Sequence, residues 1–341
     1  MMRSYQGPKH VAVARYFQNG ESQIIGAGPN ETKAPWEDLI FEIGSVTKVF
    51  TAILLCVLVE DGKVDPRAPL RQMSAELSAV PDRITPESLA THTSGLPRLH
   101  IPIWKALMKP LGEDPYADFT RSDLLAWLDS RSWKAPRARR HAYSNFGVGL
   151  LGEAMAMTEG KPFCELLNEK VIGPLGLKDT TAELDKNQSE RFLQPRNTKG
   201  TAVVPWTFRA MSAAGCLRSK ANDLGRFATQ VLQALEAPET VLDRALRRSV
   251  SPLFGLGPKG SLEPSAQCFG WQSIRIENGG PRILYHDGAT AGSTSALYVC
   301  PEKSASLVVL SNNGAGADLL ASAKLSWSNQ IRQAHGLFTS L

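Results

Sequence analysis

Apolar and polar positions alternate with a period of two near both ends of the chain, which is typical of strands with one buried face. His10–Phe17 and Ser22–Ala27 flank the turn-forming pair Asn19-Gly20, so this region is predicted to form a hairpin. Later strands, separated by short turns, are predicted at Phe269–Ile276, Arg282–His286, Ser293–Cys300 and Ser306–Ser311. Connections this short favour antiparallel pairing.

A helical period follows the short apolar strand predicted at Leu39–Ile43. Apolar residues then recur at helical spacing and predict a helix from Ser45 to about Glu60, which Asp61-Gly62 ends. From about residue 63 to residue 205, prolines are frequent and strand signals are few. Further helices are predicted at Pro86–His92, Arg121–Leu128, Phe146–Thr158, Phe163–Val171, Lys220–Leu235 and Leu319–Gln333.

These patterns together predict an α/β fold of the α+β type. We expect one antiparallel sheet of five or more strands, built from both ends of the chain and flanked by helices. A mostly helical region is expected between them. We therefore assign residues 1–62 and 206–341 to an α/β sheet domain and residues 63–205 to a mostly helical domain.

The composition is that of an ordinary soluble globular protein, with 43% hydrophobic and 21% charged residues in a chain of 341. The formal net charge of +5 is too small over this length to indicate nucleic-acid binding. One basic stretch is more typical of a solvated loop than of a surface that steers anions. Because the stretch is close in sequence to Tyr143, a candidate site residue described below, the anion-steering interpretation stays open. The members of the stretch are Arg131, Lys134, Arg137, Arg139, Arg140 and His141.

The chain contains no apolar segment that could cross a bilayer, since the longest, around Ala52–Val59, is far shorter than the roughly 20 residues required. The first residues lack the apolar core of a secretory signal. We therefore expect no membrane insertion and, unless a leader has been removed, a cytoplasmic location. The five cysteines are scattered and form no C-x-x-C pair, so neither a disulfide framework nor a zinc site is indicated.

A possible nucleophile stands at the start of the first predicted helix, in Ser45-Val46-Thr47-Lys48. Residues three apart share a helix face, so the Lys48 amine can lie beside the Ser45 hydroxyl. A buried lysine that has lost its proton can act as the base that activates a serine. Alone, this spacing is also compatible with a helix-capping serine and a surface lysine. The strand predicted just before Ser45 places this residue at the start of a helix. A helix start offers free N–H groups, and the N–H of Ser45 is a natural oxyanion donor.

Two later motifs could complete such a site. In Tyr143-Ser144-Asn145, the phenol can shuttle a proton and the amide can orient both the lysine and a substrate carbonyl. In His286-Asp287-Gly288, the glycine allows close approach of a substrate backbone, and the following Ala289 N–H could be the second oxyanion donor. Taken singly, Tyr143 could be a packed loop tyrosine and His286 a hydrogen-bonded histidine at a strand end.

The three motifs occur in the order and approximate separation of the penicillin-recognising serine enzymes. The chain most closely resembles the class C β-lactamase-like family, which includes D-alanyl-D-alanine carboxypeptidases, D-aminopeptidases, esterases of the β-lactamase fold and some acyltransferases. The resemblance spans roughly residues 10 to 312. Further matching stretches are Leu89-Ala90-Thr91-His92-Thr93-Ser94-Gly95-Leu96-Pro97, Tyr143-Ser144-Asn145-Phe146-Gly147 with Leu150-Leu151-Gly152, Pro174-Leu175-Gly176-Leu177, and Ala213-Ala214-Gly215-Cys216-Leu217 with Asp223-Leu224.

The resemblance implies the β-lactamase and transpeptidase fold and an acyl-enzyme mechanism that needs no metal or organic cofactor. It makes Ser45 the acylated nucleophile and Lys48 with Tyr143 the base system. Substrate binding falls to Asn145, His286 and Gly288, and the oxyanion hole to the N–H groups of Ser45 and Ala289. His92 belongs to a structural loop of the family and is not expected to be catalytic.

The main departure from the family is His286, which stands where the β-lactamases place a lysine. A histidine is mostly neutral at pH 7, so recognition of a penicillin-type carboxylate should be weaker. We therefore predict a serine hydrolase acting on small esters, amides or peptides, with esterase first, D-amino-acid peptidase or carboxypeptidase second and β-lactamase third. A biosynthetic acyltransferase stays open.

The alternative from a different class is a non-catalytic sensor or binding protein that keeps the fold. Such a protein is expected to have lost Ser45, Lys48 or Tyr143, and all three are present. The sequence indicates neither the oligomeric state nor the acyl and leaving groups.

Overall fold

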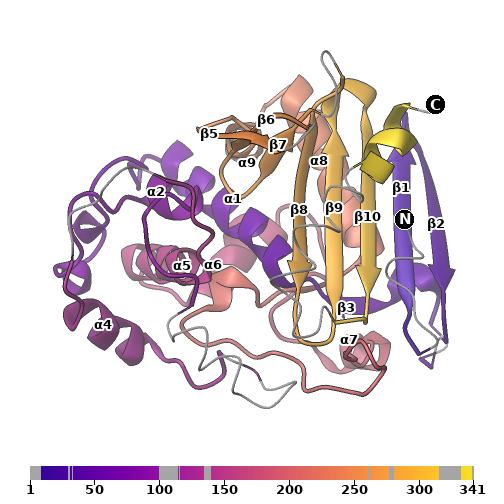
Figure 1. Cartoon of the computed structure of the whole chain (residues 1–341), viewed down its shortest axis with the longest axis horizontal. Coiled ribbons are helices and arrows are strands. Elements are labelled where there is room, and N and C mark those ends of the chain that lie inside the picture. The colour runs from indigo at the N-terminus through magenta and orange to yellow at the C-terminus, as the bar shows by residue number, and fades with distance from the viewer. Residues whose placement is uncertain are drawn as a thin grey trace.

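An eight-stranded antiparallel sheet forms the right-hand part of the molecule in Figure 1. The computed structural model describes residues 9–29, 31–32, 34–99, 114, 116–133, 140–259, 262–275, 280–314 and 332–339. The strand order is β2-β1-β10-β9-β8-β7-β6-β5. The strands are β1 (Ala12–Gln18), β2 (Glu21–Ala27), β5 (Phe254–Lys259), β6 (Leu262–Gln267), β7 (Gln272–Ile274), β8 (Ile283–Ala289), β9 (Thr294–Cys300) and β10 (Ala305–Ser311).

Pairing of β1 with β10 joins the N-terminal hairpin to strands from the end of the chain. The predicted antiparallel sheet of five or more strands, built from both ends, is thereby confirmed. Two of its strands, β5 and β6, were absent from the sequence prediction, because glycines and prolines interrupt their alternation and the register shifts twice between them. β7 is shorter than the predicted strand, since Gly270, with φ +73°, turns the backbone before it.

A small second sheet pairs β3 (Ile40–Glu42) with β4 (Arg218–Lys220). Phe41 lies opposite Ser219 in this antiparallel register. β4 has no apolar alternation and could not be recognised in the sequence. The pairing fixes the segment before Ser45 against the chain that follows residue 214, and both segments reappear in the candidate site.

Helices make up most of the remaining described chain. The α-helices are α1 (Thr47–Glu60), α2 (Pro86–Ala90), α4 (Arg121–Asp129), α5 (Asn145–Glu159), α6 (Phe163–Leu167), α7 (Lys186–Arg191), α8 (Ala221–Glu236), α9 (Val241–Ser249) and a last helix over residues 332–339. Short 3-10 turns occur at Trp36–Asp38, Gly44–Val46, Leu70–Gln72, Ala75–Leu77, Ser212–Ala214 and Pro301–Lys303, and a π turn at Asn168–Ile172 follows α6.

The main core lies between the sheet and helices α1, α8 and α9 (Figure 1). α1 is buried on every side from Thr47 to Leu58, which explains why its sequence is apolar almost all round. The rings of Phe50 and Phe227, 4.6 Å apart, join α1 to α8. The helix over residues 332–339 packs on the other face of the sheet, where Phe338 stacks on Tyr16 of β1.

The left-hand part of Figure 1 contains α2, α4, α5 and α6 beside the central α1. The described residues between 63 and 205 form helices, turns and isolated bridges, whereas the strands come from residues 12–42 and 218–311. The two predicted domain boundaries, after residue 62 and after residue 205, stay a prediction. Of the predicted helix Leu319–Gln333, all but the last two residues lie outside the described residues.

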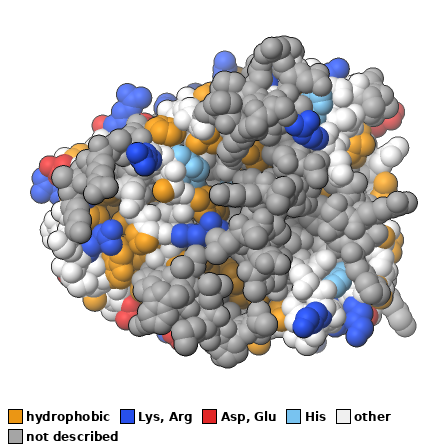
Figure 2. Space-filling view, in the orientation of Figure 1, with side chains coloured by type: hydrophobic (Ala, Val, Ile, Leu, Met, Phe, Trp, Pro, Cys, Tyr) orange, Lys and Arg blue, Asp and Glu red, His pale blue; other side chains and the backbone are white. Residues whose placement is uncertain are grey.

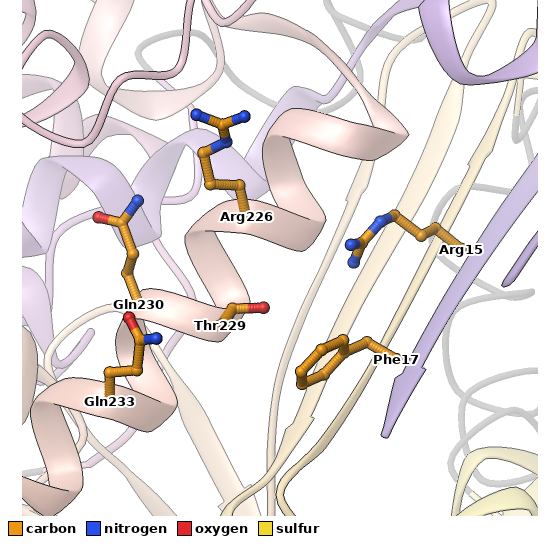
Figure 3. A pocket seen from close by; sticks show the side chains of 6 residues that line it. All are labelled: Arg15, Phe17, Arg226, Thr229, Gln230 and Gln233. Atoms are coloured by element: carbon orange, nitrogen blue, oxygen red, sulfur yellow. The ribbon is translucent and has the colours of Figure 1, made fainter. Parts of the chain in front are cut away.

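Lys and Arg side chains are spread over the face drawn in Figure 2 rather than gathered in one patch of its coloured residues. None of the helices in the described part of the chain is long and apolar enough to span a bilayer. A pocket of about 430 Å³ lies between β1 and α8, lined by Arg15, Phe17, Arg226, Thr229, Gln230 and Gln233 (Figure 3). It contains none of the residues of the predicted site.

Candidate active site

Ser45 lies in the 3-10 turn Gly44–Val46, between β3 and the start of α1. It is partly exposed, whereas the residues around it are buried. Gly44 adopts φ +47°, and a Cβ there would lie 2.9 Å from the backbone N of Ala289. Only glycine allows this left-handed turn beside β8. The predicted helix begins at Ser45, but α1 starts at Thr47 because the chain first makes this tighter turn.

Lys48 is adjacent to the serine as the spacing predicted. Its Nζ lies 3.0 Å from Ser45 Oγ and 2.5 Å from the carbonyl oxygen of Ala214. The side chain is only 2% exposed. Burial, followed by the positive charge of Arg98, lowers the pKa of Lys48 well below its ordinary value. A neutral amine has a lone pair with which to take the proton of Ser45.

Tyr143 completes this group from the segment that precedes α5. Its hydroxyl is hydrogen-bonded to the side chain of Ser45, and Lys48 Nζ lies 5.2 Å from the centre of its ring. Burial raises the pKa of the phenol above its ordinary value, more than the hydrogen bond to Ser45 and the charge of Arg98 lower it. The phenol is therefore protonated at neutral pH and can donate a proton.

Asn145 is the first residue of α5, a helix capped by the Ser144 hydroxyl, which accepts from Gly147 N at 2.8 Å. Its Nδ2 donates to the Tyr116 hydroxyl at 2.8 Å. The Oδ1 atom is buried and has no partner among the described residues. An unpaired buried carbonyl is costly, and a substrate N–H would satisfy it.

The proposed oxyanion donors, the N–H groups of Ser45 and Ala289, lie where the 43–45 segment meets the end of β8. A Cβ at Gly288 would lie 2.9 Å from Ser45 N and would collide with the carbonyl oxygen of Ile43. Ser295 Oγ donates to that same carbonyl at 2.7 Å and ties β9 to the turn. Glycines at 44 and 288 thus permit the close approach that two converging N–H donors require.

His286, on β8, is 5% exposed and uncharged. Its Nδ1 lies 2.7 Å from the carbonyl oxygen of Asp287, which can only accept, so Nδ1 carries the hydrogen. Burial, followed by the charge of Lys48, lowers the pKa of His286 to about 3. β8 therefore presents a neutral imidazole, and not a cation, at this position of the site.

The family model for β-lactamases matches residues 10–326 of the chain. The chain belongs to the Beta-lactamase family. It is 28% identical over 287 residues to the D-alanyl-D-alanine-carboxypeptidase/endopeptidase AmpH of Escherichia coli K12, covering 81% of this chain and 71% of the relative. It is 30% identical over 228 residues to a β-lactamase of Providencia stuartii, covering 65% of this chain and 55% of that one.

Solved structures of class C β-lactamases share the fold. That from Rhodobacter sphaeroides superposes with a TM-score of 0.77 at 20% identity and covers 98% of this chain and 97% of its own. The β-lactamase of Sulfitobacter sp. EE-36 gives 0.79 at 21% identity, with 99% and 94% covered. The resemblance to the class C β-lactamase-like family is confirmed, and the chain is a serine hydrolase of the β-lactamase fold.

Sequence reasoning missed several residues that surround the nucleophile of this β-lactamase-family site. Arg98 lies with its Cζ 5.1 Å from the centre of the Tyr143 ring. Tyr116 meets Asn145 and stacks on Phe208, with ring centres 4.8 Å apart. Glu42, 4% exposed, stands three residues before Ser45. Arg98 directly follows the loop that carried the family resemblance, which was a usable signal, whereas Tyr116 stood in no motif.

His92 lies beside Tyr143, with ring centres 4.4 Å apart. His92 has φ +56°, and its Nδ1 accepts from Ser144 N at 3.2 Å, so it supports the start of α5 from within its loop. His141 Nε2 lies 3.1 Å from Gln267 Oε1 on β6. Arg131 packs on Trp127, with its Cζ 4.6 Å from a ring centre. Lys134, Arg137 and Arg139 lie outside the described residues, so anion steering stays a hypothesis.

Neither a metal nor an organic cofactor was expected for the acyl-enzyme mechanism. The side chains around Ser45 offer hydrogen-bonding groups. Among the described residues, no group of three or more histidine, cysteine, aspartate or glutamate side chains could hold a metal ion. The cysteines at 56, 164, 216, 268 and 300 are free thiols.

Proposed function

We propose that this chain hydrolyses the amide bond of peptides ending in D-alanine and the ring amide of β-lactams, through an acyl-enzyme on Ser45. The 3.0 Å contact between Lys48 Nζ and Ser45 Oγ, with the lysine buried and its pKa lowered, carries the proposal. The names of the relatives support the substrate class, since they include a D-alanyl-D-alanine carboxypeptidase and several β-lactamases.

In the first half-reaction, neutral Lys48 takes the proton of Ser45 while Oγ forms a bond to the substrate carbonyl carbon. The carbonyl oxygen becomes an oxyanion, held by the N–H groups of Ser45 and Ala289. The C–N bond then breaks, and the leaving nitrogen receives a proton from the Tyr143 phenol, which Lys48 reprotonates. The product is a Ser45 ester with neutral Lys48 restored.

In the second half-reaction, a water molecule attacks the ester carbon and gives its proton to the Lys48–Tyr143 pair. The ester C–O bond breaks, Ser45 Oγ recovers a proton, and the carboxylic acid leaves. Deacylation and acylation use the same donors and the same base system. No redox or metal-dependent step enters the balance.

Ester hydrolysis is the second candidate, and His286 favours it. The neutral imidazole on β8 offers no fixed positive charge to a substrate carboxylate, as the lowered pKa of about 3 indicates. Uncharged short-chain esters need no such partner. An alkoxide is also a better leaving group than an amide nitrogen, so esters place less demand on proton donation by Tyr143.

The test is intact-protein mass spectrometry after benzylpenicillin, followed by peptide mapping. We expect a single penicilloyl adduct on Ser45 and none on Ser45→Ala. A panel containing a D-Ala-D-Ala tripeptide, a chromogenic cephalosporin and p-nitrophenyl butyrate then ranks the substrates. An adduct on another residue overturns the mechanism, and Ser45-dependent turnover of the butyrate alone replaces the peptidase with the esterase.

A further inference from the structure

The substrates proposed above carry a carboxylate, yet β8 has no cation to receive it. His286 is held neutral and its Nδ1–H is already donated to Asp287 O. Lys48 is buried and occupied by Ser45 and Ala214. A substrate carboxylate in the site therefore needs a positive group from an element other than β8.

Arg98 lies after α2, on the segment between α2 and α4. Its own carbonyl accepts from Asn145 N at 3.0 Å and from Phe146 N at 3.3 Å. The preceding carbonyl, of Pro97, accepts from Ser144 Oγ at 2.6 Å. Two consecutive peptide carbonyls are thus anchored to the start of α5, which fixes the backbone of Arg98 relative to Tyr143 and Asn145.

The guanidinium of Arg98 lies against the ring of Tyr143, with Cζ 5.1 Å from the ring centre. A cation–π contact uses none of the hydrogen bonds that the N–H groups of a guanidinium can donate. Arg98 is partly buried, and among the described residues its side chain has no hydrogen bond and no carboxylate partner. Its charge nevertheless reaches the site: burial first and then Arg98 lower the pKa of Lys48 and His92, whereas Arg98 opposes the rise in pKa that burial causes at Tyr116 and Tyr143.

We propose that Arg98 forms a carboxylate-binding subsite, so that this chain anchors an anionic substrate from the loop after α2 rather than from β8. The planar fork of the guanidinium matches a carboxylate with two parallel hydrogen bonds. The inference rests on the proposed Ser45 chemistry but concerns the charge of the substrate. It holds equally for an ester or an amide.

The first experiment compares an N-acylated tripeptide ending in D-Ala-D-Ala with the same peptide as its C-terminal amide. A second pair places the carboxylate on the acyl side: p-nitrophenyl hydrogen glutarate and its methyl ester. The quantity measured is the acid-to-neutral ratio of kcat/KM within each pair. For the wild type we expect a ratio of about 10 to 100 in one pair, which identifies the side of the scissile bond that Arg98 reads.

Arg98→Gln should bring that ratio close to 1, mainly through KM of the acid, and Arg98→Lys should recover part of it. Arg131→Gln is the matched control, because Arg131 also packs on an aromatic ring but lies outside the site, and it should keep the wild-type ratio. Labelling of Ser45 by an uncharged fluorophosphonate and the thermal unfolding midpoint verify that each variant is folded.

An equal loss for both members of each pair in Arg98→Gln overturns the inference, because Arg98 would then act through Lys48 or Tyr143. A wild-type ratio near 1 in both pairs overturns it as well. Absence of the proposed peptidase activity gives a result that differs from both of these. In that case both peptides are inert, while the glutarate pair still reports on Arg98.

Discussion

The carboxylate of Glu42 accepts a 2.6 Å hydrogen bond from the hydroxyl of Thr290, the residue that follows the oxyanion donor Ala289. Its other oxygen accepts from Trp206 N, also at 2.6 Å. Burial is the main reason that the pKa of Glu42 is raised, and the two hydrogen bonds and Arg218 oppose the rise. Glu42 thus joins β3, the end of β8 and the loop before Ser212 into one frame around Ser45.

Replacing Glu42 with Gln turns one acceptor into an NH₂ donor that faces an existing donor. One buried hydrogen bond is lost and one donor is left unpaired, so the free energy of unfolding should fall by about 1–3 kcal/mol. Because the frame holds Ala289, kcat should fall more than KM rises. Urea unfolding and steady-state kinetics measure the two effects, and Glu239→Gln, at an exposed carboxyl, is the control. Unchanged kcat with reduced stability would assign Glu42 a purely structural role.

The close contact of Gly288 with the 43–45 segment gives a second prediction. In Gly288→Ala, the new methyl would collide with the carbonyl oxygen of Ile43 and approach Ser45 N to 2.9 Å, which displaces an oxyanion donor. Loss of one such donor lowers kcat about 10²- to 10³-fold. Gly255→Ala in β5 is the matched control, since a Cβ there meets nothing within 4 Å. Equal activity of both variants would contradict the assignment of the Ser45 N–H to the oxyanion hole.

The sequence predicted the elements whose pattern is local. Helices α1 and α5 follow from the helical spacing of apolar residues, and the short turns between the predicted strands indicated antiparallel pairing. β5 and β6 escaped because the glycine- and proline-containing sequence of that hairpin hides its alternation. Their pairing is decided by neighbouring strands, which no local window contains.

The same limit applies to the site. Ser45 and Lys48 are three residues apart, so helix geometry alone could bring them together. Glu42, by contrast, bonds to residues 164 and 248 positions away, and Arg98 reaches Tyr143 across a loop. Such partners are set by the tertiary fold. The sequence therefore indicated Ser45, Lys48 and the motif residues expected around them, whereas Glu42 and Arg98 required the structure.

The lowered pKa of Lys48 predicts how activity varies with pH. Only the neutral amine can take the proton of Ser45, so kcat/KM for a neutral ester should rise with pH through the folded-state pKa of Lys48. Because the charge of Arg98 lowers that pKa, the rise should move to higher pH in Arg98→Gln. A pH–rate profile of wild type and variant measures the shift. Identical profiles would show that Arg98 does not affect the pKa of Lys48, and a wild-type profile without this rise would contradict Lys48 as the base.

The same pKa has a consequence for stability. Between the folded-state pKa and the unfolded value of about 10.5, unfolding binds a proton, so the free energy of unfolding rises with pH by up to about 1.4 kcal/mol per unit. Lys48→Met should remove this slope and stabilise the protein at neutral pH, while activity is lost. Lys186→Met, at an exposed position on α7, should retain the slope. Denaturant unfolding across pH 7–10 compares them.

If Arg98, on the loop after α2, is the cation that binds the substrate carboxylate, then a cation introduced on β8 should compensate for the loss of Arg98. In the Arg98→Gln background, His286→Lys places an ammonium beside Gly288 and should restore the acid-to-neutral ratio of kcat/KM at least about 5-fold, since one charged hydrogen bond supplies that much. His286→Gln in the same background keeps a polar side chain without the charge and should restore nothing. The double variants are first compared by thermal unfolding, because His286 is only 5% exposed and a lysine there must reach the open site. Equal restoration by lysine and glutamine would show that shape at position 286, and not charge, governs carboxylate binding.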